Sequence, residues 1–145
     1  MLEQLEADIS AALRSSDKRA ATTLRMLKSA LHNAEISKGE TLTEAEVMRV
    51  VQKEAKQRKE SIESYQAAGR DDRGQEEQLE LEIIERYLPE AIDENELTLL
   101  VQAAIDEVGA ESPADIGAVM KVLQPKIAGR ADGGKVAAEV RAKLS

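Results

Sequence analysis

The sequence has no cysteine, no phenylalanine and no tryptophan, and its 145 residues include only one histidine and three prolines. Without cysteine the chain can form no disulfide, no iron–sulfur site and no catalytic thiolate. Two tyrosines are the only aromatic residues, so the core must be built from Leu, Ile, Val, Ala and Met, which suit packing between helices. The scarcity of Gly and Pro, with 42% hydrophobic residues, excludes disordered and collagen-like chains.

The residues needed for most kinds of catalysis are also scarce. His32 is the single histidine, so neither a histidine metal cluster nor a Ser-His-Asp arrangement is indicated. No GxxxxGK[ST] phosphate loop occurs. Paired acids such as Glu76–Glu77 and Asp71–Asp72 lie in charge runs typical of a solvated face. We therefore expect no catalytic residue, metal or cofactor, and no self-sufficient enzyme.

Targeting and membrane signals are absent too. The first ten residues, MLEQLEADIS, contain no basic segment followed by an apolar run, which a signal peptide requires. No window approaches the roughly 20 apolar residues of a membrane span. We expect a cytoplasmic protein without membrane contact.

Apolar residues recur at helical spacing along the whole chain, and no segment alternates in the manner of a strand. An all-α fold is therefore predicted, with a four-helix part at residues 1–88, a linker at 89–92 and a three-helix part at 93–145. We expect helices near residues 2–13, 43–69, 93–109, 112–124 and 132–144. A further helix should end at residue 38, and another should follow a loop at 70–74 and end at residue 88.

Several helix ends carry specific signals. Thr43 followed three residues later by Glu46 predicts a capping box, and Gly69 suits the position after a helix end. Asp93 is expected to cap the first helix of the second part. Pro125 should break or kink the helix that contains it.

Charge is distributed unevenly along the chain, whose formal net charge is −8. Residues 89–120 contain eight acidic residues and no basic one, whereas residues 121–145 contain six basic residues against two acidic ones, a local charge of +4. A local positive region can hold a phosphate backbone even on an acidic protein.

The basic region gives the candidate binding residues, centred on a turn between two helices. One interpretation is that its cations grip RNA phosphates, while its glycines and aspartate shape and cap the turn. The alternative is purely structural, with the arginine paired to a neighbouring acid. The candidate RNA-binding residues are Lys126, Arg130 and Lys135, supported by Lys121 and Arg141, and the turn-shaping residues are Gly129, Asp132 and Gly133.

Arg58 falls on the apolar face of the helix predicted at 43–69. Together with Arg25 it could form a semi-buried ion-pair network with Glu77 and Glu80, and with Glu54, that fixes helix register. The alternative is a ligand site. We favour the structural network.

Three stretches resemble the GatB/YqeY family. The first is Thr23–Leu27; the second runs from Lys56 to Ile62 and on through Tyr65, Gly69–Arg70, Glu77 and Glu80 to Tyr87–Pro89; the third comprises Gly117, Val119–Met120, Pro125–Lys126 and Gly129–Gly133. The resemblance implies a stand-alone YqeY-like protein with a four-helix and a three-helix part. It also implies a relationship to the tail of GatB, which holds the body of tRNA in a glutamine-dependent amidotransferase.

From this resemblance we expect a non-catalytic tRNA-binding or RNA-binding accessory module related to aminoacyl-tRNA amidation. Its partner would be tRNA, or a translation or amidotransferase component. The alternative is a protein-interaction module whose acidic residues 89–120 dock a basic partner without RNA. Least favoured is a carbon–nitrogen ligase that uses glutamine as amido donor in its own right.

Overall fold

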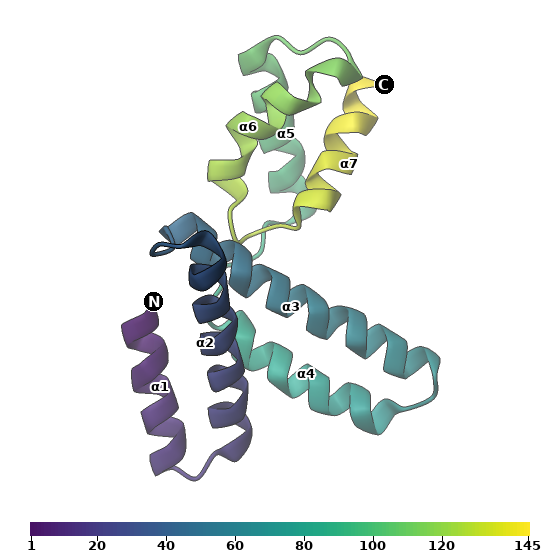
Figure 1. Cartoon of the computed structure of the whole chain (residues 1–145). Coiled ribbons are helices and arrows are strands. Elements are labelled where there is room, and N and C mark those ends of the chain that lie inside the picture. Colours follow the sequence, from purple (N-terminus) through teal and green to yellow (C-terminus); the bar gives the residue numbers. More distant parts are fainter. The chain divides into compact units, whose positions relative to one another are not determined.

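The computed structural model describes all 145 residues, and every regular element in it is helical (Figure 1). The all-α prediction is confirmed. The chain divides into two compact units, Met1–Pro89 and Glu90–Ser145. The first contains α1 (Leu2–Arg14), α2 (Lys18–Lys38), α3 (Glu44–Ala67) and α4 (Asp71–Glu85), and the second contains α5 (Glu94–Val108), a 3₁₀ turn (Pro113–Asp115), α6 (Ile116–Ile127) and α7 (Gly133–Leu144). None of these helices combines the length and the apolar character needed to span a membrane.

The first unit consists of two helical hairpins, α1 with α2 and α3 with α4 (Figure 1). Helix α2 also packs against α3 and α4, so it joins the two hairpins. Its buried residues Leu27 and Leu31 belong to one core with Leu5 of α1, Val51 of α3 and Ile84 of α4. The core shared by all four helices is therefore built from aliphatic side chains, as the shortage of aromatic residues predicts.

Three of the predicted helix ends are confirmed. Thr43 and Glu46 form the reciprocal capping box at the start of α3. Gly69 follows the end of α3 with a φ of +71°, a conformation that favours glycine. Asp93 caps α5, since its side chain accepts a hydrogen bond from the Glu96 amide at 2.7 Å.

Helix α4 begins earlier than predicted. The expected loop at residues 70–74 is wrong, because α4 already starts at Asp71 and includes Gly74. Asp71 and Asp72 lie in its first turn, where negative charge favours a helix. Gly74 is buried beside α3, but an added Cβ would meet the Ile62 carbonyl oxygen at 3.9 Å, an ordinary contact distance, so the packing does not require a glycine at this position.

The second unit packs α5, α6 and α7 around its own core, in which Val101, Val119, Leu123, Val136 and Val140 are completely buried. The break predicted at Pro125 does not occur there, because α6 continues through it to Ile127. Ile127 is buried on the same side as Val119 and Leu123, and this packing holds the last turn in place.

Candidate functional site

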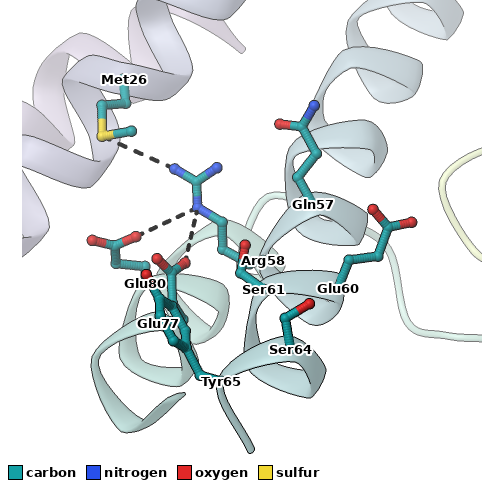
Figure 2. A pocket seen from close by; sticks show the side chains of 9 residues that line it. All are labelled: Met26, Gln57, Arg58, Glu60, Ser61, Ser64, Tyr65, Glu77 and Glu80. Atoms are coloured by element: carbon teal, nitrogen blue, oxygen red, sulfur yellow. Dashed lines mark hydrogen bonds and ion pairs between the residues drawn. The ribbon is translucent and has the colours of Figure 1, made fainter. Parts of the chain in front are cut away.

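An open hollow of about 780 Å³ lies in the first unit, with its lining drawn from α2, α3 and α4. We call it the Arg58 hollow. Figure 2 shows the guanidinium group extending toward Met26, with the carboxylates of Glu77 and Glu80 beside its Nε atom. The lining residues are Met26, Gln57, Arg58, Glu60, Ser61, Ser64, Tyr65, Glu77 and Glu80.

Arg58 is a charged residue in an almost fully buried position, with 7% of its surface exposed. Its Nη1 atom donates a hydrogen bond to Glu54 at 2.9 Å, one helical turn away. Its Nε atom lies 3.4 Å from a Glu80 oxygen and 3.9 Å from a Glu77 oxygen, yet it has no hydrogen-bond partner. Its Nη2 atom meets only the weak acceptor Sδ of Met26, at 4.0 Å. Arg58 thus connects α2, α3 and α4 through one well-formed hydrogen bond and several looser contacts.

The structure brings together four of the five residues considered for the ion-pair network. Glu54, Glu77 and Glu80 lie around Arg58, but Arg25 lies exposed on α2 and forms no ion pair with them. The helical geometry explains this difference. Successive residues of a helix point about 100° apart, and it is Met26, the next residue, that faces Arg58.

The hollow carries more negative than positive charge. Glu60, Glu77 and Glu80 line it against one guanidinium group, which also neutralises Glu54. The pKa of Glu77 is raised above its ordinary value, first by burial and then by repulsion from Glu80, and Arg58 offsets these effects only in part. The folded chain therefore holds the Glu77 carboxylate in a place that disfavours its charge.

Such a hollow is suited to binding a cationic group. Carboxylates from two helices supply the charge, and the side chains of Gln57, Ser61 and Ser64 add hydrogen-bonding groups along one side of α3. No group of three or more His, Cys, Asp or Glu side chains is arranged to hold a metal ion.

Most of the lining residues were not predicted as site residues. Glu60 and Ser61 follow Gln57 by three and four residues, and Ser64 follows them by four and three, which places all four on one face of a helix. This spacing around Arg58 was the available signal. The contribution of Met26 depends on how α2 packs against α3 and has no local signal.

The basic turn of the second unit is partly neutralised by neighbouring acids. Arg130 donates to Glu96 at 3.0 Å through Nη2 and to the backbone oxygen of Glu90 at 3.0 Å through Nε. The Ile92 amide in turn donates to the Arg130 oxygen at 3.0 Å. Lys126 lies 3.9 Å from Glu107. Arg130 thus holds the start of the second unit to the turn, as in the structural alternative considered for it.

The remaining predicted basic residues do not converge on a shared partner. Lys121 on α6, and Lys135 and Arg141 on α7, are exposed and form no ion pair. Gly129 has a φ of +75°, so the turn does require a glycine there. Gly133 has no such φ and no atom near an added Cβ; it is simply the first residue of α7.

Asp132 occupies the N-cap position of α7, but the expected side-chain cap is not formed. The backbone angle ψ does not account for the difference, because Asp17 caps α2 at 84° and Thr43 and Asp93 cap their helices at 164° and 165°, on either side of the 125° at Asp132.

Comparison with known proteins gives a family match over residues 2–144, to the family described as Yqey-like protein. Two similar proteins share the name altered inheritance of mitochondria protein 41, mitochondrial. The one from Pyrenophora tritici-repentis is 31% identical, over 90% of this chain and 73% of its own length. The one from Clavispora lusitaniae is 33% identical, over 88% of this chain and 76% of its own length.

These relatives overturn two predictions. They are named for mitochondria and not for tRNA, RNA or amidation, so the prediction of a tRNA-binding module related to aminoacyl-tRNA amidation is wrong. The expected cytoplasmic location is wrong as well, because the relatives are labelled mitochondrial. The recognition of the family itself is confirmed: over nearly its full length, this chain belongs to the Yqey-like protein family.

Proposed function

We propose that this chain is a binding protein in the mitochondrial process for which its relatives are named, and that its working site is the Arg58 hollow. In this proposal the hollow receives a lysine or arginine side chain from a segment of a partner protein. The relatives' name refers to altered inheritance of mitochondria, which gives the process. The carboxylates of the Arg58 hollow are the groups that would bind the cationic side chain.

The observation that carries this proposal is the excess of carboxylates in the hollow, where Glu60, Glu77 and Glu80 line the space around one guanidinium group. Burial and the neighbouring Glu80 raise the folded-state pKa of Glu77, so its contribution to stability is present at acidic pH and is lost as the pH rises through the folded-state pKa. The ionised form of Glu77 therefore does not stabilise the fold. A carboxylate kept at some cost in stability is typical of a binding or catalytic site.

A cationic side chain would remove the source of this cost. Placed near Glu77 and Glu80, an ammonium or guanidinium group would screen the repulsion between the two carboxylates and favour the ionised form of Glu77. The hollow is open, and Ser61 and Ser64 on its α3 side offer hydroxyl groups to the backbone of a bound segment. Arg58 has a structural role here, because it holds α3 against α4 while three carboxylates surround it.

The finer architecture also belongs to this proposal. We take residues 1–88 and 93–145 as independently folding domains, since each has a separate aliphatic core. The second, with its three helices, would correspond to the tail region of GatB, to which the family is related. The binding hollow then belongs entirely to the first domain.

A replacement experiment in yeast tests this function. Saccharomyces cerevisiae has its own altered inheritance of mitochondria protein 41, which is 33% identical over 66% of this chain. In a yeast strain that lacks this protein, the chain would be expressed as a fusion with a mitochondrial targeting sequence. We expect the wild-type chain to restore normal inheritance of mitochondria, scored as the fraction of daughter cells with functional mitochondria. The Glu60→Gln/Glu77→Gln variant should fail, because it removes two negative charges from the hollow but leaves Glu54 and Glu80 paired with Arg58.

The matched control is Glu63→Gln/Glu82→Gln. It makes the same chemical changes on the same two helices, at exposed positions outside the hollow, and should restore inheritance like the wild type. Both variants should unfold within about 0.5 kcal/mol of the wild type, as surface substitutions usually do. Full rescue by the hollow variant would refute a role for the hollow, and no rescue by the correctly targeted wild type would refute the mitochondrial function.

A further inference from the structure

Met26 combines exposure with an unusual neighbour. It lies on α2 at the edge of the Arg58 hollow (Figure 2), and 46% of its surface is exposed. The chain has four methionines; Met48 and Met120 are less exposed, and Met1 is the first residue. A dissolved oxidant therefore reaches Met26 more readily than Met48 or Met120.

The sulfur atom of Met26 faces a hydrogen-bond donor that has no better acceptor. Arg58 Nη2 lies 4.0 Å from Met26 Sδ, and a thioether is only a weak acceptor. The neighbouring Nε is directed instead at the carboxylates of Glu80 and Glu77, at 3.4 Å and 3.9 Å. A buried charged donor that meets only a thioether is poorly satisfied, so Nη2 would gain from a stronger acceptor at the position of the sulfur.

We propose that Met26 is an oxidation site, and that its sulfoxide strengthens the contact between α2 and α3 by accepting a hydrogen bond from Arg58. The oxidant is a peroxide. Hydrogen peroxide transfers one oxygen atom to Sδ, so that an S–O bond forms and the O–O bond breaks. The thioether loses two electrons, and the peroxide is reduced to water.

The expected change in stability distinguishes oxidation of Met26 from ordinary methionine damage, because it is a gain and not a loss. Oxidation usually disrupts a core by placing a polar group among apolar ones. At Met26 the new oxygen would lie at a polar, partly hydrated edge, next to a guanidinium group with unused donor capacity. Oxidation at this residue should therefore stabilise the first unit.

The test uses the full chain, treated with increasing amounts of hydrogen peroxide. Peptide mass spectrometry should show sulfoxide at Met26 before Met48 or Met120. The melting midpoint of the first unit should rise by about 4 °C, near the lower end expected for one added hydrogen bond in a unit of this size. In the Met26→Leu variant, which keeps the apolar contact but cannot be oxidised there, the same treatment should give no rise.

Three results would overturn the proposal: oxidation of Met48 or Met120 ahead of Met26, an unchanged or lowered midpoint in the oxidised wild type, or an equal rise in Met26→Leu. The proposal does not depend on the binding function of the hollow. It could fail while the hollow variant still loses function in yeast, and the reverse could also occur.

Discussion

The Arg58→Ala variant is expected to lose about 3 kcal/mol of unfolding free energy, the lower end of the range for breaking a buried ion pair. The side chain is nearly buried and holds three carboxylates, at distances of 2.9 Å for Glu54, 3.4 Å for Glu80 and 3.9 Å for Glu77. Removing it leaves these charges facing one another. The lower end applies because the carboxylates are partly exposed and can reach water. Urea unfolding at pH 7 measures the loss.

The control is Arg25→Ala, which removes the same kind of side chain from an exposed position in α2. It should change the unfolding free energy by no more than about 0.5 kcal/mol. Equal losses in the two variants would show that Arg58 does not hold the helices together through its charge.

The Leu123→Ala variant should lose about 2–5 kcal/mol from the second unit, the usual range for this change in a core. Leu123 is completely buried in α6, in a core with α5 and α7 that is separate from the core of the first unit. If the two units fold independently, a scanning calorimeter should record two transitions. Only the transition of the second unit should then move to lower temperature.

Leu99→Ala provides the matched control, since it makes the same change in the same unit at a side chain that is 71% exposed. We expect a shift of less than about 0.5 kcal/mol. If Leu123→Ala moved both transitions together, or if the wild type melted in one transition, the two units would not be independent.

The sequence predicted the features of the fold that depend on local chemistry. Helical periodicity identified an all-α chain, and the Thr43–Glu46 capping box and Gly69 located both ends of α3. Predictions failed where packing between helices decided the outcome. Gly74 looked like part of a loop, but it lies inside α4, where it is buried beside α3.

The candidate site was harder to predict than the fold, for related reasons. The apolar spacing around Arg58 indicated that a charge was buried, and the structure has Glu80 and Glu77 at 3.4 Å and 3.9 Å from it. Arg25 lies away from them, because its direction depends on how α2 is rotated against α3. For the basic turn, charge counting could not show that Glu96 and Glu90 already engage Arg130.

The most direct test of the proposed function is site-specific photo-cross-linking at Ser64, an exposed residue lining the Arg58 hollow. A photoreactive residue at Ser64 would be compared with one at Glu63, the neighbouring exposed position outside the hollow. We predict that the Ser64 probe captures a partner segment containing lysine or arginine at the linked site, and that Glu60→Gln/Glu77→Gln abolishes this adduct. Identical adducts from both positions, or a Ser64 adduct that survives the double substitution, would contradict the assignment of the hollow as the binding site.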